Sequence, residues 1–555
     1  MMAFHKNSLA LSGFLFLLGC CSTTVATGPT VLVENGTYEG VYSSTYDQDF
    51  FLGIPFAQPP LGSLRFHQPV SLNTSWDGLK RATEYYPECV GYGSDDWPYP
   101  LSEDCLALNV IRPAGYENES LPVAVWIHGG GYSEGGTRDQ RYNLSFIVQN
   151  SVELGKPIIG AAVAYRLSGW GFIDGKEIRD AGATNIGIHD QRLGLHWIQE
   201  NIAAFGGDPD KVTIWGESAG AGSVGIHLTA YNGRDDHLFR AAISESGGPI
   251  SLAGVYNATE AQGYYDAAVA TAGCSSAKYT LECLRQAPFD KLNTAFNTSA
   301  ATMPYTDGDI IAGPASEQLA RGEFVHVPYL IGTNFDEGAS FSPTGVNNDS
   351  DLESVLLAEG LPQKSVTRLL ELYPDIPDLG IPATYKGRPD YPTPGLQYKR
   401  SAAIVGDYVM HACRRLSSQA WAKANVPSYA YHFNVLVNGM TSIEGSGHFM
   451  EVAFVYDNTN GLGYYTQPNP FANEPESFAA LAKLMSRSWV SFVHDLDPNN
   501  HGVQGIPHWP VYQLDKDGYG QDFVFETNAT SHPEADTWRK EGIAYLNSIW
   551  SELGK

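Results

Sequence analysis

A serine between two glycines is the residue pattern in this chain with the clearest chemical meaning. Gly216-Glu217-Ser218-Ala219-Gly220 follows the apolar run at residues 212–215 and precedes a stretch of small residues at 221–225. Glycines at these places let a strand turn sharply into a helix and leave the serine hydroxyl accessible, an arrangement called a nucleophile elbow. Such a hydroxyl supports acyl transfer, so Ser218 is the predicted nucleophile.

Acyl transfer through a serine also needs hydrogen-bond donors for the oxyanion that develops on the substrate. His128-Gly129-Gly130-Gly131-Tyr132 follows a strand-like run at 123–127 and offers backbone N–H groups in a glycine-rich turn. A phosphate-binding loop is the rival interpretation, but no Gly-Lys-Ser/Thr sequence follows. We therefore expect the N–H groups of Gly130, Gly131 and Ala219 to form the oxyanion hole.

The base and its orienting acid are expected beyond Ser218, because in folds with this elbow the order along the chain is serine, acid, histidine. Asp336 and Glu337 directly follow the apolar run 327–331, so either could be the acid. Among the later histidines, His448 lies in a glycine-containing loop, Gly445-Ser446-Gly447-His448-Phe449. His411 lies in a helix-like run and His432 in a strand-like run, and both are expected to pack. His448 is therefore the predicted base.

The charge of the chain excludes several classes of partner. Lys and Arg number 34 and Asp and Glu number 61, which gives a formal net charge of −27 over 555 residues. Such acidity argues against binding of nucleic acid and against adhesion to anionic membranes. Scattered acidic residues favour solubility instead.

Residues 1–26 resemble a secretory leader. Lys6 precedes an apolar run at 9–18, and Thr24-Val25-Ala26 supplies the small residues of a cleavage site, expected after Ala26. The run is too short to span a membrane, and no later segment reaches the ~20 apolar residues that a span needs. Leu17-Leu18-Gly19-Cys20 also resembles a bacterial lipoprotein signal, but glycosylation sequons favour a secreted glycoprotein; they are Asn35, Asn73, Asn118, Asn143, Asn257, Asn297, Asn348 and Asn528.

Five cysteines remain once the leader is removed. In an oxidising compartment two disulfides are expected, and neither the spacing nor nearby histidines suggest zinc. Local pairing of Cys89 with Cys105 and of Cys274 with Cys283 leaves Cys413 as a buried free thiol.

Apolar, β-branched runs at 123–127, 158–164, 212–215, 241–244 and 327–331 predict buried strands. A helical pattern at 190–205 ends at Gly206-Gly207. Strands that alternate with helices predict an α/β fold with a large, mostly parallel sheet and helices on both faces. Residues 27–555 are expected to form one catalytic domain, with 342–379 as a polar surface excursion.

Several further motifs accompany the elbow and the two loops described above. They are Ser102–Val110 (SEDCLALNV), Asn185–Gln191 (NIGIHDQ), Phe205–Pro209 (FGGDP), Asp336-Glu337-Gly338, the His448 loop with Glu451 and Phe454, and Trp509-Pro510-Val511-Tyr512. Together they resemble the type-B carboxylesterase/lipase family, the cholinesterase-like branch of the α/β hydrolases, over nearly the whole mature chain. The resemblance implies a serine ester hydrolase that needs no metal or organic cofactor. It also implies that Glu337 is the orienting acid, that Asp336 is loop structure, and that the cysteines pair as above.

Two residues keep alternative interpretations. The resemblance implies that Glu217 stabilises charge near the site, but it could equally be a structural carboxylate under the turn. Trp97 could form an aromatic wall at the entrance, or it could pack its loop against the protein.

The loop closed by the first disulfide predicts the class of substrate. In lipases of the resembling family this loop is a long amphipathic flap, whereas residues 90–104 are short and contain Asp95, Asp96 and Glu103 with glycines and prolines. Such a loop offers no apolar helical face to a lipid surface. We therefore predict a secreted esterase whose partners are a soluble short-chain or aromatic ester and water, without stable membrane insertion. The alternatives are an interfacial triacylglycerol lipase, an acyltransferase, and an inactive adhesion relative; such relatives lose the serine or histidine, which this chain keeps.

Overall fold

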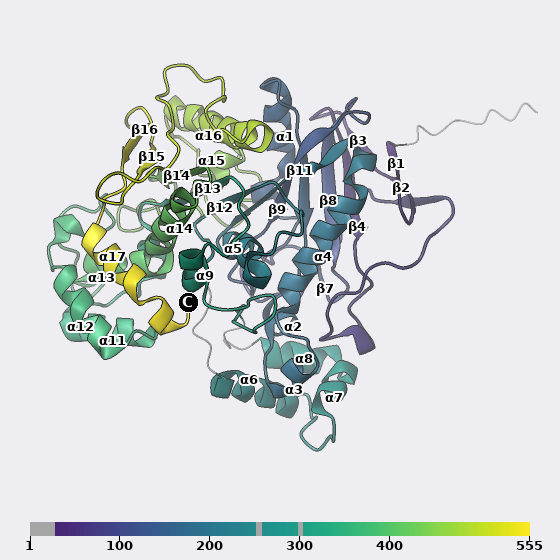
Figure 1. Ribbon diagram of the computed structural model, residues 1–555, viewed down its shortest axis with the longest axis horizontal. Coiled ribbons are helices and arrows are strands. Elements are labelled where there is room, and N and C mark those ends of the chain that lie inside the picture. The colour runs from purple at the N-terminus through teal and green to yellow at the C-terminus, as the bar shows by residue number, and fades with distance from the viewer. Residues whose placement is uncertain (1–27, 251–257, 298–302) are drawn as a thin grey trace, which may run out of the picture.

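Parallel strands form the middle of a large twisted sheet (Figure 1). The computed structural model describes residues 28–250, 258–297 and 303–555, so the predicted leader lies outside the described residues. Within these ranges the main sheet has eleven strands. In spatial order they are β16 (His532–Ala535), β15 (Gln521–Phe525), β14 (Ser428–Phe433), β13 (Tyr329–Asn334), β12 (Ala241–Glu245), β11 (Gly207–Glu217), β9 (Leu121–Ile127), β10 (Ile159–Val163), β8 (Ala107–Pro113), β4 (Gln48–Pro55) and β3 (Val41–Ser43).

All five apolar runs predicted to be strands form neighbouring members of this sheet. Adjacent strands are parallel from β10 through β9, β11, β12, β13 and β14 to β15. Antiparallel pairs occur only toward the two edges of the described sheet, at β8, β4 and β3 on one side and β16 on the other. The α/β fold class predicted from the sequence is confirmed.

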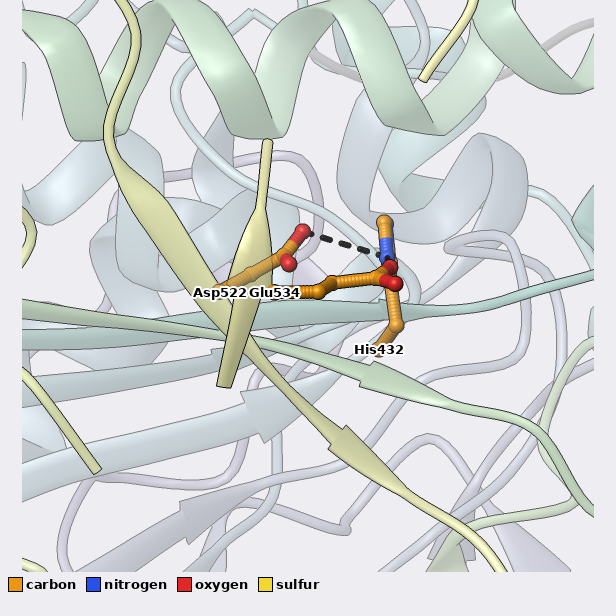
Figure 2. A group of neighbouring side chains, drawn as sticks. All are labelled: His432, Asp522 and Glu534. Atoms are coloured by element: carbon orange, nitrogen blue, oxygen red, sulfur yellow. Dashed lines mark ion pairs between the residues drawn. The ribbon is translucent and has the colours of Figure 1, made fainter. Parts of the chain in front are cut away.

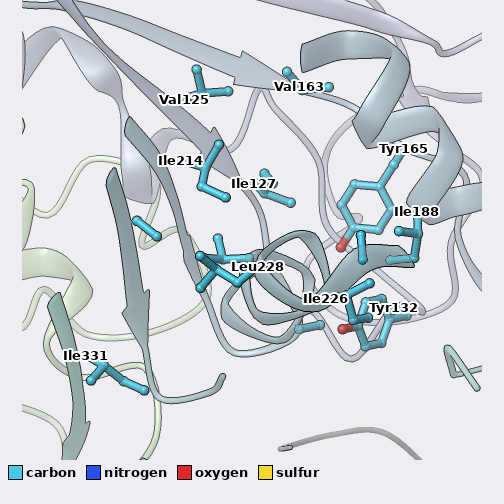
Figure 3. Packing of buried hydrophobic residues seen from close by; sticks show 14 of the residues in the cluster. Val125, Ile127, Tyr132, Val163, Tyr165, Ile188, Ile214, Ile226, Leu228 and Ile331 are labelled. Carbon is cyan, nitrogen blue, oxygen red and sulfur yellow. The ribbon is translucent and has the colours of Figure 1, made fainter. Parts of the chain in front are cut away.

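Both faces of the sheet are buried, which is why its strands read as continuous apolar runs. Along β9, Val123 and Val125 belong to the core cluster that includes α4 (Ile186–Asn201) and α5 (Ala219–Gly233). Trp126, between them and the strand end, belongs to the opposite cluster with α1 (Leu144–Glu153) and α16 (Glu476–Asp495). Figure 3 shows Ile214 of β11 and Leu228 of α5 in the first cluster.

A group of helices lies beside the β13–β16 side of the sheet (Figure 1). It comprises α11 (Asp349–Ala358), α12 (Gln363–Leu372), α13 (Tyr398–Gly406), α14 (Ala412–Lys423) and α17 (Lys540–Ile549). The polar stretch 342–379 therefore contains two helices. Leu352 and Leu356 of α11 and Val366 and Leu369 of α12 are buried in the core, so this stretch is anchored.

The predicted helix at 190–205 begins earlier than its apolar pattern indicates. Helix α4 starts at Ile186, because Asn185 adopts a left-handed conformation (φ 48°) and anchors the turn by donating from Nδ2 to the Tyr305 carbonyl. A short 3₁₀ turn, Ile202–Phe205, completes the segment before Gly206 ends it.

The remaining elements lie around this framework. A three-stranded sheet contains β1 (Thr30–Val33), β2 (Gly36–Glu39) and β5 (Leu79–Arg81), and β6 (Glu88–Cys89) pairs with β7 (Leu101–Ser102). The smaller helices are α2 (Ser168–Phe172), α3 (Lys176–Asp180), α6 (Ala258–Thr271), α7 (Thr280–Gln286), α8 (Phe289–Phe296), α9 (Ala315–Arg321), α10 (Glu337–Phe341) and α15 (Val452–Val455).

Both expected disulfides are present. Cys89 is bonded to Cys105, and Cys274 is bonded to Cys283 where α6 meets α7. Cys413 lies buried in α14 as a free thiol, and burial raises its pKa to about 12.

Peptide mapping of the unreduced, leader-processed protein should recover the two disulfide-linked pairs. Iodoacetamide at pH 8 should modify Cys413 only after unfolding, because a thiol is reactive as an accessible thiolate. Mass spectrometry before and after addition of guanidinium chloride measures this difference. Rapid labelling of the folded protein, or Cys413 in a crosslinked peptide, would contradict the assignment.

Candidate active site

Ser218 lies between β11 and α5 in a strained backbone conformation. Its φ of 55° and ψ of −121° are unusual for a residue other than glycine, and such strain costs about 1–3 kcal/mol. The flanking glycines permit very close packing: a Cβ on Gly216 would lie 2.5 Å from the backbone carbon of Gly220, and a Cβ on Gly220 would lie 2.0 Å from the Ile127 carbonyl oxygen. The predicted elbow is therefore present.

His448 connects Ser218 to Glu337. Its Nε2 lies 2.8 Å from Ser218 Oγ, and its Nδ1 lies 2.7 Å from Glu337 Oε2. Because the carboxylate can only accept, the proton on Nδ1 leaves Nε2 free to accept from the serine hydroxyl. Three side chains predicted from distant parts of the sequence thus form one hydrogen-bonded chain.

Glu337 is the first residue of α10 and is completely buried. Its Oε1 accepts hydrogen bonds from the Asn334 backbone N–H at 2.8 Å and from the Ser246 hydroxyl. The adjacent Asp336 instead accepts from the Ser446 N–H at 2.9 Å, as expected of a residue that shapes the loop. The choice between the two acids thus follows from the direction of each side chain.

The histidine loop is held on both sides of His448. Asn334 Nδ2 donates to the Gly447 carbonyl at 2.7 Å, and the His448 N–H donates to Ser340 Oγ at 3.0 Å. Sequence reasoning missed Asn334 and Ser246. Both lie at the carboxyl ends of parallel strands, where active-site groups gather, and this position is the signal that could have identified them.

Glu217 lies buried beside the histidine. Its Oε1 is 3.3 Å from His448 Nε2, and no described residue donates a hydrogen bond to it. This oxygen therefore faces the imidazole, which favours the interpretation of Glu217 as a charge near the site over that of a carboxylate hydrogen-bonded under the turn.

Two more carboxyl groups, those of Glu245 and Glu451, are buried near the site. Glu245 Oε1 accepts hydrogen bonds from the indole N–H groups of Trp215 and Trp489 at 2.5 and 2.6 Å. Glu451 Oε2 accepts from Asn334 Nδ2, and its Oε1 lies 3.3 Å from Ser246 Oγ. Burial raises the pKa of Glu245 well above its usual range, and burial with the neighbouring Glu337 raises that of Glu451 to about 7.

The carboxyl groups control the protonation of His448. Burial by itself disfavours the imidazolium, but the negative charges of Glu217 and Glu337 outweigh it and raise the pKa of His448 to about 9. Burial in turn raises the pKa of Glu217 well above its usual range. A protonated Glu217 carries no charge and stabilises the imidazolium less, so the raised pKa of His448 is attributed chiefly to Glu337.

The glycine-rich turn lies next to the elbow. Gly130 and Gly131 have φ of 92° and 60°, and the Gly130 carbonyl accepts from the Glu134 N–H at 3.1 Å. Among the described residues, nothing accepts a hydrogen bond from the N–H of Gly130, Gly131 or Ala219. These N–H groups are therefore available to an incoming oxygen.

Trp97 is 61% exposed and lines a small depression with Tyr99, Arg141 and Tyr465. This exposure argues against the packing interpretation, and a role as a substrate wall stays a proposal.

His411 and His432 are buried away from Ser218, as expected. His432 belongs to the one group among the described residues with metal-ligand spacing; Figure 2 shows it with Asp522 and Glu534. Arg414 Nη2, which can only donate, lies 3.2 Å from His432 Nε2, so the imidazole proton is on Nδ1, 3.1 Å from Asp522 Oδ2. This leaves no lone pair for a cation, and the donor set fits an ion-pair network better than a metal centre.

The sheet order, the elbow after a central strand and the serine–histidine–glutamate chain define an α/β hydrolase. The family model described as "Carboxylesterase family" matches residues 27–537. The chain therefore belongs to the carboxylesterase family and is a serine hydrolase that acts on esters.

Relatives of known name cover most of the chain. It is 35% identical over 531 residues to Secreted lipase 1 of Botryotinia fuckeliana (strain B05.10), and the alignment covers 88% of each chain. It is 34% identical over 537 residues to Lipase 4 of Diutina rugosa, and the alignment covers 88% of this chain and 90% of the relative. Among solved structures, EstA of Aspergillus niger superposes with a TM-score of 0.81 at 28% identity, and the match covers 95% of this chain and 99% of the other.

The reactivity of Ser218 should increase with pH through the range above 6.5. Neutral His448 must accept the hydroxyl proton, and its raised pKa means that a higher pH is needed to obtain the neutral form. The rate of inactivation by an organophosphate, measured from pH 5 to 10, should give a midpoint above that of free imidazole, because the Glu337 carboxylate favours the imidazolium. A midpoint at or below 6.5 in the unaltered enzyme would contradict this assignment.

Proposed function

We propose that this enzyme is a secreted esterase that cleaves dissolved short-chain or aromatic esters through an acyl-serine intermediate. The observation that carries the proposal is the hydrogen-bonded chain from Ser218 through His448 to Glu337. Its substrates are one small ester and water.

Acylation begins when Ser218 Oγ attacks the ester carbonyl carbon and His448 Nε2 takes the hydroxyl proton. The carbonyl π electrons move to oxygen, and the N–H groups of Gly130, Gly131 and Ala219 stabilise the resulting oxyanion. When the oxyanion collapses, the bond to the alcohol oxygen breaks, and the alcohol leaves with the proton from Nε2.

Deacylation repeats these steps with water as the nucleophile. His448 accepts a proton from water as it attacks the acyl carbon, then returns that proton to Ser218 Oγ as the carboxylic acid leaves. Glu337 keeps the imidazole oriented through Nδ1–H and stabilises its cationic form. Glu217, 3.3 Å from Nε2, adds a second acidic group on the serine side of the ring.

The contacts of the 90–104 loop support a preference for dissolved substrates. The Tyr92 N–H donates to the Ser133 carbonyl at 2.7 Å, and the Asp95 N–H donates to Glu134 Oε2 at 2.8 Å. Asp96 Oδ1 accepts from the Gly135 N–H at 3.1 Å. These bonds fasten the loop to the segment that follows Gly130 and Gly131. Opening the loop as a flap would break them and expose little apolar surface in return.

A second candidate is an interfacial triacylglycerol lipase. The names of the relatives favour it, because both sequence relatives above are called lipases and another, from Gibberella zeae, is called a secreted triacylglycerol lipase. Such an enzyme requires a mobile apolar lid. The segment 342–379 could supply one only by withdrawing the buried leucines of α11 and α12 from the core.

We also infer that residues 1–26 are a cleaved secretory leader and that residues 27–555 form a single catalytic domain. The family match begins at residue 27, and relatives are named as secreted. No helix within the described ranges is both long and apolar enough to cross a membrane.

Ser218→Ala and His448→Ala should each lower kcat for p-nitrophenyl acetate by about 10⁴-fold, because each removes a member of a unit that acts together. Ser354→Ala, on the exposed side of α11, is the matched serine control and should retain full activity. Circular dichroism establishes that each variant is folded. Organophosphate labelling that persists in Ser218→Ala would show that another residue is the nucleophile.

Hydrolysis of tributyrin should follow simple saturation and show no jump in rate when the substrate exceeds its solubility limit. The fastened 90–104 loop has no large apolar face to exchange with an oil surface, and the negative charge opposes binding to an anionic one. Initial rates on both sides of the limit, beside a lipase with known interfacial activation, provide the comparison. Activity on emulsified long-chain triglyceride above that on dissolved esters would instead support the lipase candidate.

A further inference from the structure

A second cavity lies outside the Ser218 site, between the C-terminal helices and the end of β13. Its volume is about 390 Å³, within the usual range for small-molecule sites. Phe335, Leu379, Ile381, Ala403 and Trp538 supply much of its apolar lining. Several lining residues belong to α12, α13 and α17, which are labelled in Figure 1. None of the three residues of the serine–histidine–glutamate chain lines it.

The cavity wall is continuous with the loops that hold Glu337 and His448. Phe335 precedes Glu337 by two residues, and its N–H donates to the Phe433 carbonyl at 2.8 Å. Pro382, between two lining residues, packs against the histidine loop: a Cβ on Gly445 would lie 2.6 Å from Pro382 Cβ. An occupant would therefore touch segments that position both the acid and the base.

The positive charges at the cavity are already neutralised. Arg539 Nε donates to Asp407 Oδ2 at 2.6 Å, and Arg400 Nη1 donates to Asp349 Oδ1 at 2.8 Å. Lys399, whose Nζ donates to the Tyr385 carbonyl, keeps its charge but does not line the cavity.

Two further lining residues, Asp378 and Glu541, are acidic and exposed. A free carboxylate would therefore meet net negative charge, whereas an uncharged ligand avoids this repulsion. The chemistry therefore favours an uncharged, mainly apolar molecule.

We propose that this cavity binds a second small molecule that is uncharged and mainly apolar, as the proposed ester substrate is, and that its occupancy changes kcat through the loops of Glu337 and His448. No bond is made or broken at this second site. The effect on kcat rests on the proposed esterase function, whereas binding does not. The size of the coupling equals the difference in the ligand's binding free energy between the two arrangements of the loops.

Binding can be tested with 2-nonanone, which has an apolar chain and a carbonyl but no ester bond. Isothermal titration calorimetry uses enzyme whose Ser218 is blocked with an organophosphate, and, in parallel, Ser218→Ala. One saturable site is expected. Leu379→Asp and Ala383→Trp, which alter exposed lining positions, should each weaken binding at least tenfold. Leu357→Asp alters an exposed leucine of α11 outside the cavity and should leave binding unchanged.

The effect on turnover is measured as the ratio of kcat for p-nitrophenyl acetate with and without 2-nonanone. A ketone that only competes at Ser218 raises KM and leaves kcat unchanged, whereas occupancy of the second cavity should change kcat by at least twofold. Leu379→Asp should abolish this change, and Leu357→Asp should keep it.

The outcomes separate the two proposals. Absence of saturable binding to both blocked enzyme and Ser218→Ala, or equal binding by all cavity variants, would overturn the second site. Binding without any change in kcat would overturn the coupling. Failure of the organophosphate to label Ser218 would count against the esterase function and leave the binding test in Ser218→Ala valid. Unfolding curves in urea confirm that each variant is folded.

Discussion

The active site depends on one strained residue held at the end of a central strand. Ser218 can keep its unfavourable backbone angles only because β11 is fixed between β9 and β12 and because α5 begins at the next residue. The close approach of Gly220 to the Ile127 carbonyl leaves no room for a side chain. The same geometry aligns the carboxyl ends of the neighbouring strands. The glycine-rich turn follows β9 and Ser246 follows β12, the two neighbours of β11, and Glu337 follows β13, the next strand beyond β12.

The site also buries several carboxyl groups around one histidine, and each of them needs a hydrogen-bond donor or a positive charge nearby. Unpaired carboxylates in a protein interior are costly, and each of these has specific donors or the imidazole beside it. Asn334 has a central position in this arrangement because its backbone supports Glu337 while its side chain contacts both Glu451 and the Gly447 carbonyl. The acid and the histidine loop are thereby fixed to one another as well as to the sheet. A preorganised site of this kind supports catalysis because little rearrangement is needed as charge develops.

The loops of this site also contact two regions outside it, the 90–104 loop and the second cavity. The segment after Gly130 and Gly131 is fastened to the 90–104 loop by Glu134 and Asp96, which connects this loop to the proposed oxyanion hole. On the opposite side, Phe335 and Pro382 join the acid and histidine loops to the wall of the second cavity. Rigidity at Ser218 therefore coexists with two surfaces through which ligands or substrates could affect it.

Much of this arrangement follows from the sequence by itself. Short-range patterns determined the buried strands, the elbow at Ser218, the glycine-rich turn and the local pairing of cysteines, because strand periodicity and glycine backbone freedom act over a few residues. Motif order and the family resemblance selected Glu337 and His448. The tertiary structure decided what depends on contacts between distant segments: the start of α4 at Asn185, the exposure of Trp97, and the approach of Glu217 to the imidazole. It also revealed Asn334 and Ser246, whose side chains form hydrogen bonds with residues far away in the sequence. Such contacts are set by the packing of whole elements, and no spacing along the chain encodes them.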